Sequence, residues 1–105
     1  TCFANDYGYE NWVAKALECY SDAEDTVILI SSSGQSKNML IAANKAKHMN
    51  LNVVTLSGFS SKNPLRNLGD INLWVDSNAY NIIEMTHHVW LLSIVDYIIE
   101  LNNKE

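Results

Sequence analysis

A short strand-like run constrains the fold of this chain more than any other feature. Residues 26–30, Thr-Val-Ile-Leu-Ile, form a continuous run that is rich in β-branched side chains and apolar on both faces. A strand of this kind belongs in a sheet that is covered on both sides, which is typical of parallel sheets in α/β proteins. The run therefore predicts a parallel sheet with helices on its two faces.

Helix and strand patterns alternate along the rest of the chain. Apolar residues recur at helical spacing in three segments and form short strand-like runs in two others: residues 10–20, 37–49 and 81–100, and residues 52–56 and 72–75. Pro64 favours a short helical turn that ends near Gly69. The order contains at least one right-handed βαβ unit. Three strands are few for a doubly covered sheet, so residues 1–105 are expected to be the later part of a single domain.

Composition argues against several kinds of partner. The formal net charge of −5 leaves no basic face to neutralise a nucleic-acid backbone. Cys2 and Cys19 lack a CxxC spacing and predict no disulfide framework, so a reducing cytoplasm is the expected location. The longest apolar stretch, residues 89–99, is shorter than the ~20 residues that a membrane span needs. We expect a cytoplasmic globular domain without a nucleic-acid or membrane partner.

A serine-rich segment follows the first predicted strand and leads into a helix. Several backbone N–H groups converge at such a helix start, and the helix dipole adds positive potential. Gly34 lets the backbone approach closely, and the four serine hydroxyls can donate to phosphate oxygens. The alternative is that Ser33 or Ser36 only caps the helix while the other serines make a turn. The predicted phosphate-binding residues are Ser31, Ser32, Ser33, Gly34, Gln35 and Ser36.

A carboxylate and an imidazole stand near the start of the last predicted helix. Glu84 and His88 are four residues apart, so both lie on one helix face. Such a pair can remove a proton beside a carbonyl group and return it at the neighbouring carbon, and these two residues are the predicted catalytic groups. No further ligand cluster accompanies them, so no metal site is predicted. The alternative is that His87 and His88 form helix surface or a subunit contact, and that Glu84 favours the helix dipole.

Four segments of the chain resemble the sugar isomerase (SIS) domain family, and in particular its phosphoheptose isomerases. VILISSSGQS, at residues 27–36, resembles the family's strand and S-x-S-G-x-S loop, and NVVTLSG, at residues 52–58, resembles its next strand. ANDYGYENW, at residues 4–12, is similar to a G-N-D-[FY]-G-[FY] segment. IIEMTHHVWLLSIVDYII, at residues 82–99, is similar to the last helix, which begins with an I-Q-E-x-H pattern. The match is with the later part of the family.

The resemblance implies a three-layer, flavodoxin-like α/β fold that lacks its first half here. It also implies a phosphosugar whose phosphate lies on the serine loop and whose sugar lies near Asp6, with Asn5 beside it. Without the resemblance, Asp6 reads equally well as an ordinary turn residue. The activity implied is that of an aldose–ketose isomerase acting on a substrate of the sedoheptulose 7-phosphate type.

The last helix departs from the family pattern where catalytic and zinc-binding side chains are expected. The family's glutamine and histidine at these positions correspond to Ile83 and Leu91. No cofactor is therefore predicted, although the resemblance by itself would allow zinc. These two departures favour an alternative function, a non-catalytic SIS protein that senses phosphosugars or binds protein partners.

The last predicted helix also bears on assembly. Residues 81–100 are apolar around most of the helix circumference, and one sheet covers only one helix face. We expect a homo-oligomer, a tetramer or a dimer, with this helix in the interface. The rival explanation is that the rest of the domain covers the second helix face.

Overall fold

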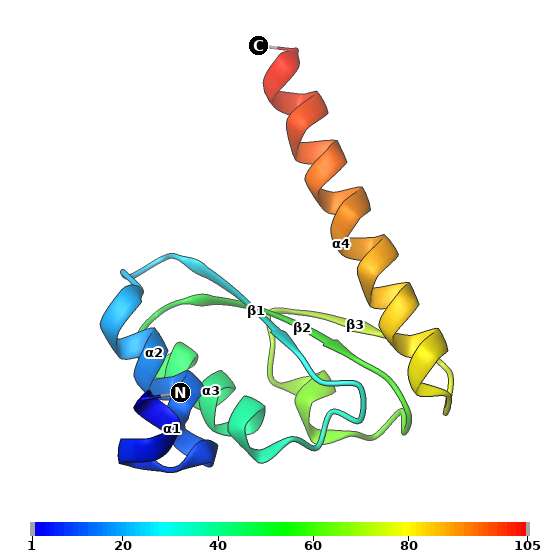
Figure 1. The fold of residues 1–105 in the computed structure, drawn as a ribbon. Helices are drawn as coiled ribbons and strands as arrows, with labels where there is room; N and C mark the ends of the chain where they lie inside the picture. The colour runs from blue at the N-terminus through cyan, green and yellow to red at the C-terminus, as the bar shows by residue number, and fades with distance from the viewer. Residues whose placement is uncertain (1, 105) are drawn as a thin grey trace.

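The computed structural model describes residues 2–104, which form a three-stranded parallel sheet with helices packed below it (Figure 1). The strands lie side by side in the order β1 (Thr26–Ile30), β2 (Asn52–Ser57) and β3 (Ile71–Trp74). Residues 2–104 also form four α-helices and two 3-10 turns: α1 (Cys2–Tyr7), η1 (Tyr9–Asn11), α2 (Trp12–Tyr20), α3 (Lys37–His48), η2 (Pro64–Asn67) and α4 (Tyr80–Asn103). The predicted α/β class and parallel sheet are confirmed.

The strand and helix boundaries agree closely with those expected from periodicity. The main difference is at the start, where a 3-10 turn precedes α2 and the six-residue helix α1 had no counterpart in the prediction. None of the α1 residues is buried, so the segment carries no apolar stripe that a periodicity argument could detect. Asn5 and Asp6 consequently lie in a helix and not in a turn.

The core lies between the sheet and the helices beneath it. Leu29 and Val53 extend from neighbouring strands toward α2 and α3, and both are buried. The side of α3 that meets them carries only small side chains, Ala42, Ala43 and Ala46, each of which is fully buried. These alanines let the helix lie close to the strands, because a close-packed interior leaves no room for larger groups there.

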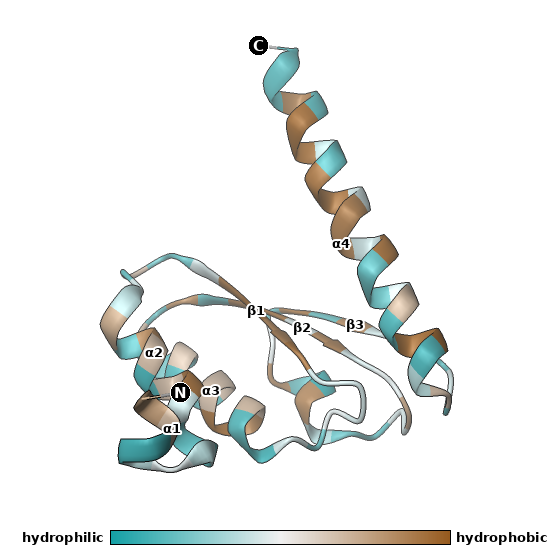
Figure 2. Ribbon diagram, viewed as in Figure 1, coloured by the Kyte–Doolittle hydropathy of each residue, from teal (hydrophilic) through white to brown (hydrophobic). Residues whose placement is uncertain are grey.

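The upper face of the sheet is not covered by any element of residues 2–104 (Figure 1), and the strands are built largely of hydrophobic residues (Figure 2). Ile28 pairs with Val54, which in turn pairs with Ile71, so the three side chains form one row across the sheet. Ile28 is 43% exposed and Ile71 is 57% exposed. The expected covering of both faces is therefore found on one face only within the described residues.

Helix α4 projects away from the sheet (Figure 1). Only Ile83 and His87 are buried among its 24 residues. The rest of the helix exposes a long series of large apolar side chains: Ile82, Met85, Val89, Leu92, Ile94, Val95, Tyr97, Ile98, Ile99 and Leu101.

By length and composition α4 could also cross a membrane, with an 18-residue window of mean hydropathy 1.3. The sequence-based estimate measured a shorter apolar stretch, whereas the helix continues well beyond it at both ends. The first turns of α4 contact the end of β2. Ile83 packs on Gly58, and His87 forms a hydrogen bond with the carbonyl oxygen of Ser57.

Candidate functional site

The serine loop turns tightly between the end of β1 and the start of α3. The N–H of Ser31 donates to the carbonyl of Leu56 at 3.0 Å, which extends the pairing of β1 with β2 by one residue. The N–H of Gly34 donates back to the carbonyl of Ser31 at 3.1 Å. Gly34 has φ +68°, a left-handed conformation that glycine adopts without steric penalty. The chain therefore reverses within four residues and delivers Ser36 to the first turn of α3.

The four serine hydroxyls divide into one that holds the loop together and three that can serve a ligand. The hydroxyl of Ser31, a residue only 6% exposed, accepts from the N–H of Gly34 and donates to the Oγ of Ser36 at 3.0 Å. Because the Oγ of Ser36 accepts that bond, its own hydrogen is free to point elsewhere. The Oγ of Ser33 accepts from the N–H of Gln35 and likewise keeps its hydrogen, and the hydroxyl of Ser32 has no partner within residues 2–104.

The same segment also holds backbone N–H groups without acceptors. Five N–H groups around the start of α3 donate to no acceptor within the part of the chain that the structure describes, namely those of Ser32, Ser33, Ser36, Lys37 and Asn38. Ser36 occupies the N-cap position of α3, yet its side chain makes no capping hydrogen bond. Helix capping therefore explains where Ser36 lies but not what its hydroxyl does. Free N–H groups at the start of a 12-residue helix form an anion-binding arrangement.

A cavity of about 410 Å³ adjoins the loop at the carboxyl end of β1. It is lined by Tyr9, Glu10, Ile30, Ser36, Lys37, Asn38 and Met39. The carboxylate of Glu10 lies 3.4 Å from the ammonium group of Lys37, so η1 and α3 meet across this cavity. Sequence reasoning did not single out Tyr9 or Glu10, because nothing in the local pattern relates η1 to the helix start that it faces.

The structure does not bring the other predicted site residues into this cavity. Asn5 and Asp6 are exposed on α1, which packs on η1 and α2, and neither lines the cavity. Glu84 and His88 are exposed on α4, and their side chains form no hydrogen bond or ion pair with each other or with the rest of residues 2–104. Of the predicted site residues, Ser36 is the only one that lines this cavity within residues 2–104.

The residues present do not fit a zinc ion. Ile83, at one of the two matching positions, is fully buried, and Gly58 lies against its side chain. Leu91, at the other, offers no donor atom. Within residues 2–104 no group of three His, Cys, Asp or Glu side chains lies close enough to hold a metal.

His87 has a structural position that its sequence context did not reveal. The residue is 3% exposed, and its Nε2 lies 2.9 Å from the carbonyl oxygen of Ser57 at the end of β2. A carbonyl oxygen can only accept, so Nε2 must carry the hydrogen of that bond. This bond occupies one side of the imidazole and removes His87 from the exposed groups that could meet a substrate.

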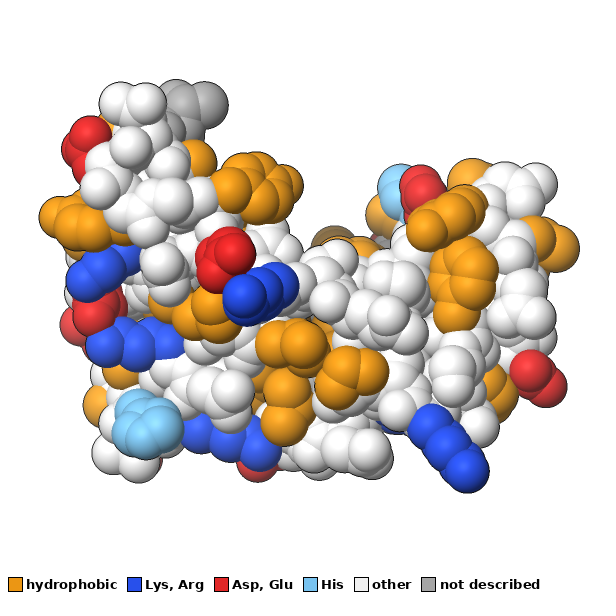
Figure 3. All heavy atoms as spheres, turned by 90° about the horizontal axis from the view of Figure 1, so that it is seen from below, with side chains coloured by type: hydrophobic (Ala, Val, Ile, Leu, Met, Phe, Trp, Pro, Cys, Tyr) orange, Lys and Arg blue, Asp and Glu red, His pale blue; other side chains and the backbone are white. Residues whose placement is uncertain are grey.

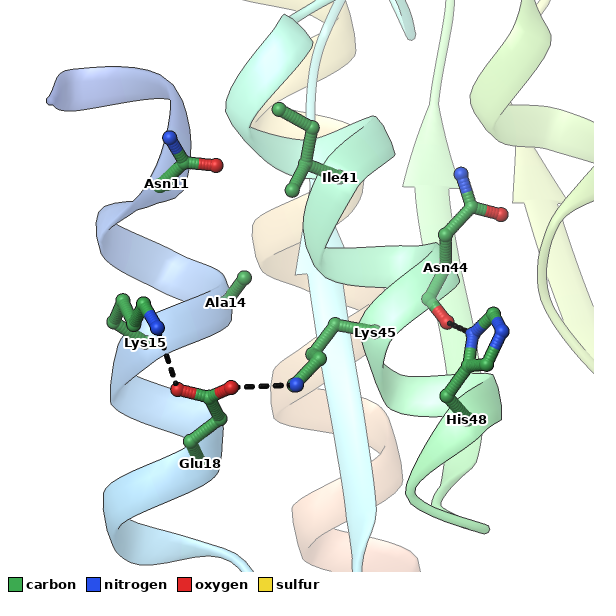
Figure 4. A pocket seen from close by; sticks show the side chains of 8 residues that line it. All are labelled: Asn11, Ala14, Lys15, Glu18, Ile41, Asn44, Lys45 and His48. Carbon is green, nitrogen blue, oxygen red and sulfur yellow. Dashed lines mark hydrogen bonds and ion pairs between the residues drawn. The ribbon is translucent and has the colours of Figure 1, made fainter. Parts of the chain in front are cut away.

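A second cavity, of about 470 Å³, lies between α2 and α3 (Figure 4). Glu18 bridges two lysines there, with Lys15 at 3.1 Å and Lys45 at 2.5 Å. Two hydrogen bonds lower the pKa of the Glu18 carboxyl, and the one from Lys45 has a larger effect than the one from Lys15. Basic and acidic side chains also stand close together on this side of the helix-covered face (Figure 3). The charges of this cavity are satisfied by one another, and it contains no residue of the serine loop.

Comparisons with known proteins agree with the fold. The chain matches no family model. It is 37% identical over 98 residues, 93% of its length, to a phosphoheptose isomerase of Helicobacter pylori, and 34% identical over the same length to one of Mycobacterium tuberculosis. The chain spans about half the length of these curated relatives.

Solved structures give the same result. A phosphoheptose isomerase from Francisella tularensis superposes with a TM-score of 0.83 and 28% identity, covering 90% of this chain and 51% of that one. One from Neisseria gonorrhoeae gives 0.82 and 25%, covering 92% and 55%. The chain is therefore homologous to phosphoheptose isomerases over about half of their length, and over that half it has their sugar isomerase (SIS) fold.

Proposed function

We propose that this chain is the phosphate-binding part of a phosphosugar isomerase that acts on a substrate of the sedoheptulose 7-phosphate type. The observation that carries the proposal is the serine loop, where residues 32–38 hold free N–H groups and three free hydroxyl hydrogens around the start of α3. A phosphate dianion there would accept several hydrogen bonds, each worth about 1.5–3 kcal/mol when one partner is charged. The relatives named phosphoheptose isomerase support the choice of a phosphorylated sugar.

The adjoining cavity would hold the sugar. With the phosphate on the loop, the carbon chain of the substrate would extend over Tyr9 and Glu10 toward α1, which carries Asn5 and Asp6. We keep Asn5 and Asp6 as proposed sugar contacts at the far end of that path. Hydroxyl groups of a sugar are suitable partners for these carboxylate and amide side chains.

The proton transfer requires an acid–base group from elsewhere. Glu84 and His88 are exposed on α4 and line neither of the two cavities described above, so we propose that they act on a substrate held by a neighbouring copy. His87 is not a candidate, because its ring is buried and bonded to Ser57. Aldose–ketose isomerisation needs only a base that removes one proton and returns it at the next carbon.

The decisive experiment is an isomerisation assay on the full-length protein with sedoheptulose 7-phosphate. We expect turnover, and we expect unphosphorylated sedoheptulose to bind far more weakly, because it lacks the group that the loop recognises. Tight binding without turnover would favour the phosphosugar-sensing alternative. Absence of binding to either sugar or inorganic phosphate would contradict the function proposed for the loop.

Assembly is a separate prediction. The exposed apolar side of α4 and the uncovered sheet face lead us to propose a dimer or tetramer with α4 in the interface, since large apolar patches drive association. Val89→Glu and Leu92→Glu together should shift the sedimentation coefficient toward the monomer. A parent protein that sediments as a monomer at micromolar concentration would contradict the interface and any site shared between copies. Burying this surface would keep the protein water-soluble, in agreement with the expected cytoplasmic location.

A further inference from the structure

We propose that Asn63, which lies outside the serine loop, is the positioning residue that fixes the loop for its anion. This inference rests on the proposed function, the binding of phosphate by residues 31–36. Asn63 follows β2 after a short loop, is 1% exposed, and directly precedes η2. Neither its type nor its sequence context marks it as part of the site.

The side-chain amide of Asn63 is oriented unambiguously by its neighbours. Its Nδ2 lies 3.1 Å from the Oγ of Ser57, 3.1 Å from the carbonyl of Gly58 and 3.0 Å from the carbonyl of Ser60. Its Oδ1 accepts from the N–H of Arg66 at 2.9 Å. Carbonyl oxygens can only accept and a backbone N–H can only donate, so the amide cannot be reversed. A buried group satisfied on both ends holds one position.

The serine loop rests on this fixed amide. Gly34 lies so close to Asn63 that a Cβ atom added to the glycine would overlap the Asn63 side chain. Such an atom would be 2.8 Å from the Asn63 Cβ. The carbonyl of Gly34 accepts from the N–H of Leu65 at 3.1 Å, just beyond Asn63. The contact with Asn63 and the hydrogen bond from Leu65 together hold the turn of the loop against residues 63–65. Asn63 therefore fixes the conformation of the loop that carries the free N–H groups of Ser32, Ser33 and Ser36.

The simpler explanation is that Asn63 only caps η2 through its Oδ1. Capping uses a single acceptor, and it accounts neither for the three acceptors around Nδ2 nor for the contact with Gly34. The two explanations differ in the effect of serine, which is as good a capping residue as asparagine but is too short to fill the space beside Gly34.

The test is Asn63→Ser in the full-length protein, with dissociation constants for inorganic phosphate and sedoheptulose 7-phosphate measured by calorimetry. If Asn63 positions the loop, both constants should rise about tenfold, which corresponds to ~1.4 kcal/mol and lies within the usual coupling of residues in one network. In the isomerase assay KM should rise while kcat is kept, because binding of the phosphate is the same in substrate and transition state. A residue that only caps η2 would leave all of these values unchanged.

Two further variants keep the test decisive. Asn72→Ser changes a second networked asparagine, which lies on β3 and bonds Thr55 of β2 and Gly69. It does not touch the serine loop, so the change should lower stability without raising the dissociation constants. Ser57→Ala removes one acceptor of Asn63 and should raise the constants about two- to threefold even if Asn63→Ser does not fold.

The possible failures are distinguishable. A parent protein that binds neither probe overturns the proposed function, and with it this inference. A parent that binds, together with folded Asn63→Ser and Ser57→Ala variants that bind equally well, overturns the role of Asn63 alone.

Discussion

Replacing Ser33 and Ser36 together with alanine is expected to weaken phosphosugar binding at least about tenfold, because two hydroxyl donors to a charged group, worth ~1.5–3 kcal/mol each, are lost. Both side chains keep a hydrogen available for a ligand, and the double change also removes two hydrogen bonds within the loop, those that Ser36 Oγ accepts from Ser31 and Ser33 Oγ accepts from the Gln35 N–H. Titration calorimetry with sedoheptulose 7-phosphate measures the change, and circular dichroism checks the fold.

The matched control is Ser61→Ala, which removes an exposed serine hydroxyl without a hydrogen bond in the loop before η2. Its affinity should equal that of the parent. If the double variant also binds as the parent does, with its fold intact, the serines serve only as turn and cap residues and the phosphate site is disproved.

Replacing Gly34 with alanine is expected to destabilise the protein and abolish phosphate binding. The φ of +68° strains any residue with a Cβ by about 1–2 kcal/mol, and overlap with the buried Asn63 side chain adds about 1–3 kcal/mol of overpacking. In the displaced loop the free N–H groups would no longer be in position to donate to one phosphate group. Denaturant unfolding gives the change in stability, and calorimetry gives the change in affinity for inorganic phosphate.

Gly8→Ala separates backbone strain from overlap. Gly8 also has a positive φ, +86°, but no atom lies within 4 Å of the position of its missing Cβ. It should lose only the strain energy, on the order of 1–3 kcal/mol, and its folded fraction should bind phosphate normally. Normal phosphate binding by Gly34→Ala would contradict the close packing of the serine loop on Asn63.

Much of the fold was predictable because its signals are local. The apolar run of β1 and the helical spacing in α3 and α4 are periodicities within one segment, and their boundaries agree with the structure to within a few residues. The short helix α1 escaped prediction because no side chain in it is buried. Its position in turn separates Asn5 and Asp6 from the cavity beside the loop, which no local pattern could have indicated.

The sequence by itself determined the order of strand, serine loop and helix, since a parallel strand followed by a helix start always directs free N–H groups beyond the strand's carboxyl end. Only the tertiary structure decided which hydroxyls remain free, because the bond between Ser31 and Ser36 depends on how the loop closes. It also decided that Asn63 supports Gly34 and that His87 bonds Ser57, a residue 30 positions away. Such contacts join segments that no periodicity relates, and the requirement to satisfy buried polar groups selects them only after the chain has packed.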